Sequence, residues 1–490
     1  MQSIHTAWRL EKNCNPWGPS VNPSLGAEDC LFNLAFAGFW LELEYTAKRK
    51  RRSLKVNLKS WTAGIAVLTL AATPVFAQDL GQWSYDQQFT PVGCDSCCDD
   101  SCCGDDSCCD DSCCGDDCCG CGSGVGGGGL LSGMGGGRIE GFTLAGALGI
   151  DAWDIGGWTQ FGWTDDNVPQ SSARGDALAF LDSPDRFNLH QQYFYIGKEA
   201  DGSCGLDLGF RADFVYGVDA QKTQAFGNPA NSFDFGWNNG TYGWAIPQLY
   251  AEIAMNDVSV KIGHFYTLIG YEVVTSPDNF FFSHALTMFN SEPFTHTGVL
   301  GTYSGFENLT LYGGWTLGWD TGFDNINSGN SFLGGFSASM SDDVTLTYMS
   351  TYGNFGARDG GNNDSYSQSI VLDVSLTDNL NYVIQSDWVA IDAGGDQFVT
   401  DRPIITANDQ VGINQYLFYQ WNDILSFGTR MEWWKSDGQS NYAYTTGVNV
   451  KLLDNLVLRP EVRQDWTPGA GGTFGNTSRS NMACDMVLTY

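Results

Sequence analysis

The chain has 490 residues and a formal net charge of -32, with 61 glycines, 14% aromatic residues and only 16% charged residues. The acidic balance argues against nucleic acid as a partner, because phosphate binding needs clustered Lys and Arg, and the one basic run, Lys48–Arg52, has a different explanation. Few charges with many glycines and aromatic residues fit a transmembrane β-barrel. On composition alone, a secreted β-sandwich or β-propeller fits about as well.

The first 77 residues contain an export signal. A basic run, Lys48–Arg52, precedes an apolar stretch at about 61–72 and small residues that end at Ala77. This order predicts a signal peptide cleaved after Ala77, and the apolar stretch is shorter than the about 20 residues of a membrane-spanning helix. A nuclear-localisation patch would explain only the basic run. Residues 1–47 are unusual before a signal peptide, and are either a long tail or a start site assigned too early.

Residues 78–138 are rich in Cys and then in Gly, and they are expected to form a periplasmic linker rather than a packed domain. Twelve of the 16 cysteines lie between Cys94 and Cys121. Exported cysteines usually form disulfides, whereas adjacent thiolates could instead hold a soft metal such as Zn or Cu(I). The spacing is not that of a zinc finger. The paired cysteines open to either role are Cys97, Cys98, Cys102, Cys103, Cys108, Cys109, Cys113, Cys114, Cys118 and Cys119.

From 139 to 490 the hydrophobic pattern has a period of two. In 206–216, Leu208, Phe210 and Phe214 alternate with Asp207, Arg211 and Asp213. Such alternation predicts a strand with one apolar and one charged face, and in a membrane barrel the charged face lines the lumen. The same pattern recurs at 370–376, 425–433 and 456–466. No 18-residue apolar run follows the signal, and lipid admits only helices and closed barrels.

Short polar turns and long polar loops alternate along this region. Asn and Asp tolerate turn conformations, so they mark tight hairpins. The seven predicted turns are 201–203, 256–257, 307–308, 342–343, 378–379, 422–423 and 454–455. Longer loops lie between them, for example at 320–330, 354–364 and 392–409.

These turns predict an all-β fold, a transmembrane antiparallel up-and-down barrel of about 16 strands (14–18) over 139–490. The first strand lies between Ile139 and Trp163, each turn adds two strands, and the last strand ends at Tyr490. An even count puts both termini on the periplasmic, short-turn side. The alternating C-terminus with its terminal aromatic residue is similar to the signal read by the barrel assembly machinery.

Several motifs in the middle of the chain are shared with a known family. They are Tyr-Gly-Trp-Ala-Ile-Pro-Gln-Leu-Tyr-Ala-Glu at 242–252, Val-Lys-Ile-Gly-His-Phe-Tyr at 260–266, Pro-Asp-Asn-Phe-Phe at 277–281 and Glu-Pro-Phe-Thr-His-Thr-Gly at 292–298. The set closely resembles the β-barrel porin 2 family, frequent in planctomycetes, and the likeness covers roughly 140–490. The resemblance implies an outer-membrane porin. It brings no catalytic residues and no cofactor, and it implies little about the solute.

The candidate site is the charged face of the strands together with the long loop after the fifth strand. In general porins a loop early in the chain narrows the lumen, which makes this loop a candidate constriction; an exposed external loop is the competing interpretation. The loop candidates are Asp278, Asn279, His284, Glu292 and His296. The wall candidates are Asp207, Arg211, Asp213, Glu252, Lys261, Asp373, Asp387, Arg430, Glu432, Lys451, Arg459, Glu461, Arg463 and Asp465. Their near balance of charge predicts weak, mildly cationic selectivity.

The function these patterns favour is a porin that lets small hydrophilic solutes and ions diffuse passively across the outer-membrane bilayer, with a homotrimer as a further hypothesis. One rival is a barrel enzyme built on His284 and His296, although no nucleophile elbow, P-loop or dinucleotide fingerprint is present. A second rival is a structural envelope barrel crosslinked or anchored through its Cys-rich linker. A soluble secreted β-protein is the third.

Overall fold

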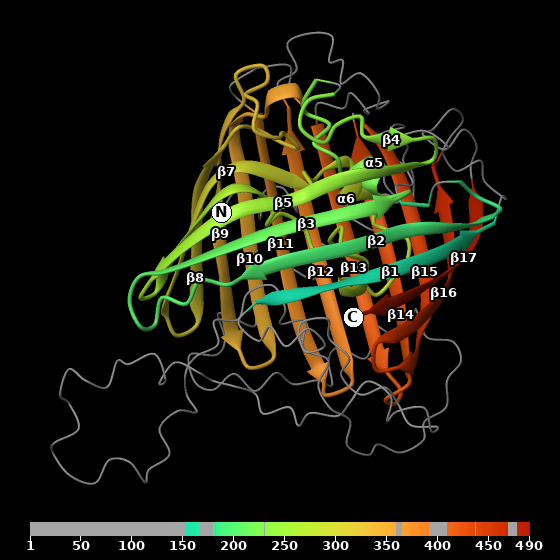
Figure 1. The fold of residues 1–490 in the computed structure, drawn as a ribbon. Helices are drawn as coiled ribbons and strands as arrows, with labels where there is room; N and C mark the ends of the chain where they lie inside the picture. The colour runs from blue at the N-terminus through green and yellow to red at the C-terminus, as the bar shows by residue number, and fades with distance from the viewer. Residues whose placement is uncertain are drawn as a thin grey trace, which may run out of the picture. The chain divides into compact units, whose positions relative to one another are not determined.

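The structure, a computed structural model, describes residues 153–165, 180–181, 183–229, 231–358, 365–391, 409–436, 438–468 and 478–490. These residues form an antiparallel barrel (Figure 1). The sheet has 17 strands, but the two-residue β4 (Asn238–Asn239) only pairs with the start of β5, so sixteen strands make the wall. This confirms the predicted fold and strand number.

The wall strands follow one another in chain order. They are β1 Asp154–Thr164, β2 Arg186–Lys198, β3 Asp207–Gly217, β5 Tyr242–Met255, β6 Val258–Tyr266, β7 Thr295–Phe306, β8 Leu309–Thr316, β9 Asn330–Ser341, β10 Val344–Asn354, β11 Ser365–Thr377, β12 Leu380–Ala390, β13 Asp409–Gln420, β14 Leu425–Ser436, β15 Gln439–Leu453, β16 Leu456–Trp466 and β17 Arg479–Thr489. Short helical turns are α5 Ala220–Thr223, η2 Ser276–Asp278, α6 Leu286–Asn290 and η3 Gly356–Arg358. No helix in the described part of the chain is long and apolar enough to cross a membrane.

The barrel closes between its first and last strands. β17 pairs antiparallel with β1 over seven residue pairs, from Trp158 opposite Thr489 to Thr164 opposite Ala483. The Tyr490 amide also donates to the Gly157 carbonyl at 2.9 Å. Closure leaves no strand edge unpaired, which is the condition for a sheet surrounded by lipid.

The two faces of each strand differ as the sequence pattern predicts. On β3, Leu208 is 62% exposed on the outer face, whereas Asp213 on the inner face is 1% exposed. Ile262 on β6 and Trp315 on β8 repeat the exposed apolar outer face. Apolar side chains outside and charged side chains inside are the arrangement of a barrel that sits in lipid.

All seven predicted short turns connect the strands at one end of the barrel. The barrel also begins and ends there, since Asp154 lies opposite Gly197, at the end of β2 next to the β2–β3 turn. The Thr489 amide donates to the carbonyl of Asn455, in the turn between β15 and β16, at 2.9 Å. The predicted signal peptide, the linker and its paired cysteines lie outside the described residues.

A charge placed on the outer face tests the assignment of the two faces. Replacing Ile262 with Arg is expected to lower the free energy of unfolding in lipid by about 2–4 kcal/mol, because the charge would face hydrocarbon. Thr302→Arg on the neighbouring strand β7 is the control, since Thr302 lies on the same strand face as the inward-packed Leu300. Denaturant titration in detergent-free vesicles measures both. Equal losses would mean that the outer face is not lipid-exposed.

Candidate functional site

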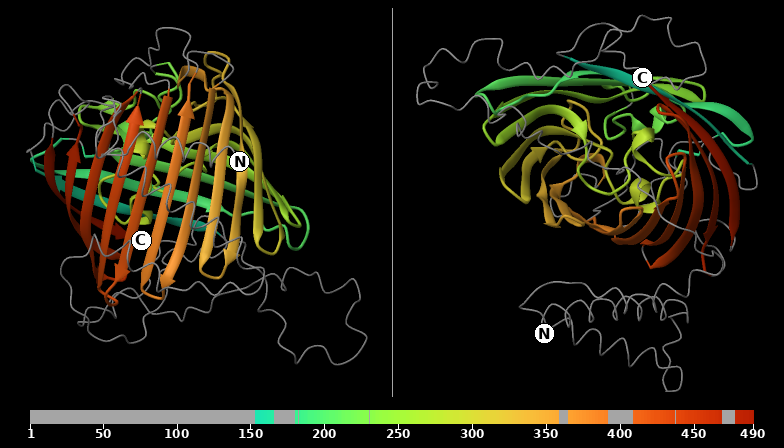
Figure 2. Two further views of the ribbon diagram at one scale, coloured as in Figure 1. Left: turned by 180° about the vertical axis from the view of Figure 1, so that it is seen from behind. Right: turned by 90° about the horizontal axis from the view of Figure 1, so that it is seen from below.

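The connection between β6 and β7 folds into the barrel (Figure 2, right). This inner segment, residues 267–294, contains η2 and α6. It leaves the wall at β6 and makes its strongest polar contacts with β14 and β16. Because β14 lies halfway round the sixteen-strand ring from β6, the segment crosses the lumen.

Arg430 of β14 is the centre of the contact between wall and inner segment. Its Nη1 donates to Glu272 Oε1 and to the Ser283 carbonyl, each at 2.7 Å. Its Nε donates to Glu432 Oε1 at 2.6 Å, and the other oxygen of Glu432 accepts the Leu286 amide at 2.7 Å. Arg430 and Glu432 are both almost fully buried. The guanidinium therefore binds one carboxylate from the wall and one from the segment.

A second set of contacts comes from β16. Arg459 Nη1 donates to the Ser276 carbonyl at 2.8 Å, while its Nε donates to Asp485 of β17 at 2.9 Å. Glu461 accepts the backbone amides of Phe282 at 2.9 Å and Ser283 at 3.1 Å. These backbone amides would otherwise be buried without partners. Hydrogen bonds to a charged carboxylate such as Glu461 are stronger than those to a neutral acceptor.

Arg463 completes this set by donating from Nη1 to the His284 carbonyl at 3.0 Å and from Nε to Asp465 at 2.9 Å. Within the segment, burial acts to raise the pKa of Glu272, but the Arg430 guanidinium and His284 outweigh it and lower that pKa to about 2. Glu272 is therefore ionised at neutral pH and remains paired with Arg430.

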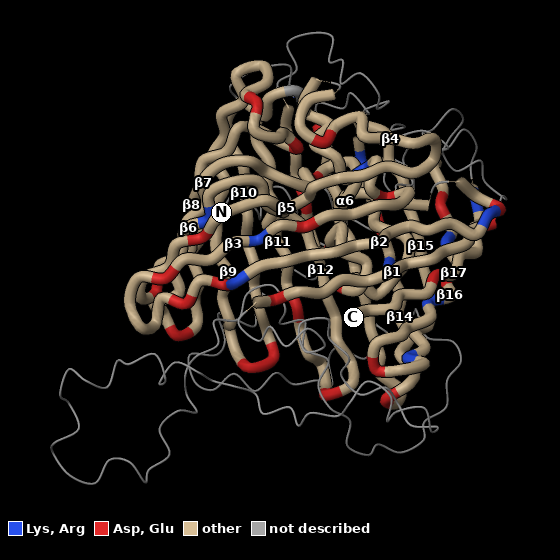
Figure 3. Tube along the Cα trace, in the orientation of Figure 1, with Lys and Arg blue, Asp and Glu red and all other residues tan. Residues whose placement is uncertain are grey.

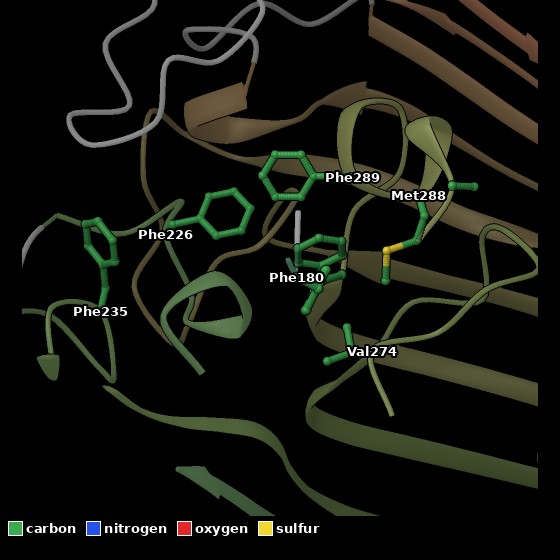
Figure 4. Packing of buried hydrophobic residues seen from close by; sticks show 8 residues of the cluster. Phe180, Phe226, Phe235, Val274, Met288 and Phe289 are labelled. Atoms are coloured by element: carbon green, nitrogen blue, oxygen red, sulfur yellow. The ribbon is translucent and has the colours of Figure 1, made fainter. Parts of the chain in front are cut away.

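The inner segment also has a hydrophobic core of its own (Figure 4). Val274, Met288 and Phe289 of the segment pack with Phe226 and Phe235 from the connection between β3 and β5. Phe180 and Phe294 join the same cluster, and their rings lie 5.7 Å apart. An apolar cluster inside a polar barrel fixes the segment by packing as well as by hydrogen bonds.

The wall beside the segment, on β2 to β6, is less buried. Arg211 of β3 keeps 22% of its side chain exposed, and its guanidinium lies 3.9 Å from the ring centre of Tyr195. Its Nε donates to Asp213 at 2.5 Å and its Nη1 to Asp154 at 3.0 Å. Half-buried Lys261 of β6 lies 4.9 Å from the ring centre of Tyr250, the cross-strand partner of Arg211.

Asp278 of η2 extends from the inner segment toward this wall. Burial raises the pKa of its carboxyl, and the positive charges of Arg211 and Arg459 act against that rise. The carboxyl of Asp278 is thus influenced by one arginine of β3 and one of β16, two strands that β17, β1 and β2 separate in the ring.

Of the nineteen candidate residues, Asp387 is buried, and Asp373 and Lys451 keep part of their surface. The other sixteen divide into the same two groups. Twelve are buried: Asp213, Glu252, Asn279, His284, Glu292, His296, Arg430, Glu432, Arg459, Glu461, Arg463 and Asp465. Four keep part of their surface: Asp207, Arg211, Lys261 and Asp278. Most members of the buried group bond to the inner segment, to its flanking residues or to each other. Their polar groups therefore form hydrogen bonds and ion pairs within the protein rather than with solvent.

The histidines illustrate this placement. His284 Nδ1 lies 3.4 Å from Glu272 and its ring packs against Phe180. His296 of β7 is fully buried and pairs with the Thr267 hydroxyl at 3.1 Å and the Gly318 carbonyl at 3.2 Å. His264 is likewise buried and lies 2.7 Å from the Thr297 hydroxyl. No group of three or more His, Cys, Asp or Glu in the described ranges is arranged to hold a metal ion.

Several residues that hold the inner segment did not enter the predicted set, and Asp485 and Gln191 are two of them. Asp485 could have been found, because Cys484, Met486 and Leu488 alternate on the outer face and leave Asp485 on the inner face. Gln191 of β2, which donates to the Val274 carbonyl at 2.8 Å, had no such signal. The register between β1 and β2 shifts between Gln160 and Phe161, which leaves His190 of β2 without an opposite residue. This β-bulge makes β2 depart from simple alternation at Gln191.

Comparison with known proteins gives a family match over the barrel. Residues 153–489 match the family model described as "Putative beta-barrel porin-2, OmpL-like". No curated protein matches the sequence significantly. Among solved structures, an anion-selective porin from Comamonas acidovorans is 11% identical with a TM-score of 0.48, over 69% of this chain and 99% of that chain. The channel DcaP of Acinetobacter baumannii is 8% identical with a TM-score of 0.46, over 69% and 97%.

Removing the central arginine tests how the segment is held. Arg430→Gln is expected to lower the free energy of unfolding by about 3–5 kcal/mol, because buried Glu272 would lose its guanidinium partner and Glu432 would keep only Arg463, at 3.1 Å. The control is Lys451→Gln, whose half-exposed ion pair with Asp454 at 3.3 Å should contribute about 0–1 kcal/mol. Limited proteolysis should also cut the inner segment faster in the Arg430 variant. Equal stability of the two variants would contradict the anchoring role.

Proposed function

The chain belongs to the OmpL-like β-barrel porin-2 family, and from this premise we propose that the inner segment sets the width of its pore. As a member of that family the protein is an outer-membrane porin, a channel for passive diffusion of small hydrophilic solutes and ions. The observation that carries the proposal is the crossing of the lumen by residues 267–294 from β6 to β14.

Solutes would pass between the inner segment and the wall of β2 to β6. Arg211, Lys261 and Asp278 keep part of their surface in this region, whereas Arg430 and Arg463 are fully buried. The exposed charges would therefore contact solutes, and the buried arginines would hold the segment in place. Fixed charges beside a narrow passage are the means by which pores choose among ions.

A non-enzymatic role fits the same geometry. His284 and His296, the side chains on which a barrel enzyme would depend, are buried and bonded within the protein. Both barrel ends lie on the short-turn side, which supports periplasmic termini when combined with the predicted signal peptide. Homotrimer formation and recognition by the barrel assembly machinery remain predictions.

The short turns add an acidic rim to the pore (Figure 3). Every one of the seven turns carries at least one Asp or Glu. The rim residues are Asp201, Asp257, Glu307, Asp342, Asp343, Asp378, Asp423 and Asp454. Lys198 and Lys451 lie at the same end of the strands and offset only part of this charge. A ring of negative charge at one mouth favours cations, which supports a mild cation preference.

Single-channel recording tests the pore and its narrowest part. The refolded chain from Gln78 onward is expected to give stepwise conductance in a planar bilayer. Arg211→Gln should shift the reversal potential toward cations, because it removes a partly exposed positive charge from the passage. Arg186→Gln, at the exposed start of β2 and away from the short-turn end, is the matched control. A folded, membrane-inserted protein without conductance would refute the pore. Equal shifts of the reversal potential in the two variants would mean that solutes do not pass beside Arg211.

The acidic rim predicts a salt-dependent preference. Replacing the rim residues of four turns with their amides should lower the cation-to-anion permeability ratio at 0.1 M salt, where the Debye length is about 10 Å. At 1 M salt, where that length is about 3 Å, wild type and variant should converge. Reversal potentials under salt gradients measure both. A ratio that is insensitive to the rim would assign selectivity to the interior alone.

A further inference from the structure

Two carboxyl groups meet where the inner segment rejoins the wall. Glu292 belongs to the segment and Asp387 to β12. The side-chain nitrogen of Gln385 donates to Glu292 Oε1 and to Asp387 Oδ2, each at 2.7 Å. The two carboxyls are also within hydrogen-bonding reach of each other. One amide nitrogen thus binds an oxygen from both acids.

This pair is buried and tightly packed. Glu292 is 6% and Asp387 1% exposed, and Asp387 Oδ1 has no hydrogen-bond partner among the described residues. Gly270, with a φ of +98°, lies against Glu292 so closely that a Cβ there would be 1.9 Å from Glu292 Oε2. The Glu292 carboxyl therefore packs against the backbone of Gly270 and occupies the space that a side chain there would need.

The charged groups around the pair do not neutralise it. On the segment, Glu272 is bound to Arg430 of β14, which also holds Glu432. On β13, buried Tyr416 lies close enough to Glu272, Glu432 and Glu292 to be influenced by their charges. From η3, Arg358 donates to the Asn290 carbonyl at 3.3 Å. Neither Glu292 nor Asp387 has an ion pair with a basic side chain in the described part of the chain. Two ionised carboxylates here would repel each other at low dielectric.

We propose that Glu292 and Asp387 share one proton at neutral pH, and that this acid pair positions the end of the inner segment against β12. The proton lies between a segment oxygen and a wall oxygen, so it replaces repulsion with a hydrogen bond. The consequence for conductance rests on the proposed function above. The protonation itself does not, since it concerns only the contact between segment and wall.

The direction of the pH effect follows from the environment of Glu292. Burial and the charge of Asp387 raise its pKa well above the ordinary value, and the hydrogen bond from Gln385 opposes that rise. A group with a raised pKa contributes stability below that pKa and loses it as the pH rises through it. Alkaline pH should therefore weaken this anchor, while the Arg430 contacts, which need ionised carboxylates, persist.

Infrared spectroscopy tests the shared proton without reference to transport. We expect the spectrum of wild type at neutral pH to contain a protonated-carboxyl band. The difference spectra between wild type and Glu292→Gln, and between wild type and Asp387→Asn, should each show the loss of that one band. Asp373→Asn, which removes a half-buried acid from the inner face of β11, should leave that band in place. Absence of the band from wild type would overturn the proposal, even in a protein that conducts. Loss of segment protection with EDTA at neutral pH would also overturn it, in favour of a bound divalent cation.

Conductance as a function of pH tests the positioning role. Wild type should show a step in conductance as the pH rises, and Glu292→Gln should abolish the step, because Gln preserves the shape of the side chain without its titratable charge. Asp373→Asn should retain the step. A step that persists in Glu292→Gln and Asp387→Asn would refute the role. If the protein does not conduct at any pH, alkaline proteolysis of the segment replaces conductance, and only the transport proposal fails.

Discussion

Closure of the sheet between β1 and β17 is the constraint on which the rest of the structure depends. Lipid offers no hydrogen bonds, so every strand must find two neighbours and the last must return to the first. Closure then assigns one face of every strand to lipid and the other to the interior, which turns a period-two sequence into an apolar outside and a charged inside. The free-energy cost of burying the carboxylates and arginines is tolerable only because this interior contains polar partners and is not hydrocarbon.

The charged interior in turn makes the inner segment possible. A loop buried without partners would leave its backbone amides unsatisfied, at a cost of several kcal/mol in total. Glu461 and Glu432 accept those amides, and Arg430 and Arg459 bind the carbonyls of Ser283 and Ser276. Removing water from two charges is costly unless further hydrogen bonds satisfy them, and here the segment's backbone supplies those bonds. The wall and the segment therefore stabilise each other's polar groups.

The sequence was sufficient for the barrel because strands and turns have local causes. The alternation in 456–466 and the turn at Asp454-Asn455 fixed both bounds of β16 without knowledge of its neighbours. The anchors are different, because Arg430 and Glu272 lie 158 positions apart and meet only when the segment crosses the lumen. Gln191 shows a second limit, since a bulge changes which face it occupies. Period and spacing report the face of a strand, and they do not report what covers that face.

That distinction changes how charge in the pore has to be counted. Alternation assigns Arg430, Arg459, Arg463 and their acidic neighbours to the lumen, which suggests a balanced, unselective wall. Their burial against the segment removes three positive charges from contact with solutes. The remaining accessible bases on the described inner face are few, with Arg211 and Lys261 beside the segment and Lys198 and Lys451 nearer the rim, while acids remain at all seven short turns. Because exposed fixed charges dominate the field in water, ion preference should follow this remainder rather than the full composition of the inner face. On this argument, the acidic balance of the chain and the burial of three arginines against the inner segment would both favour a pore that admits cations more readily than its arginine-rich wall would indicate.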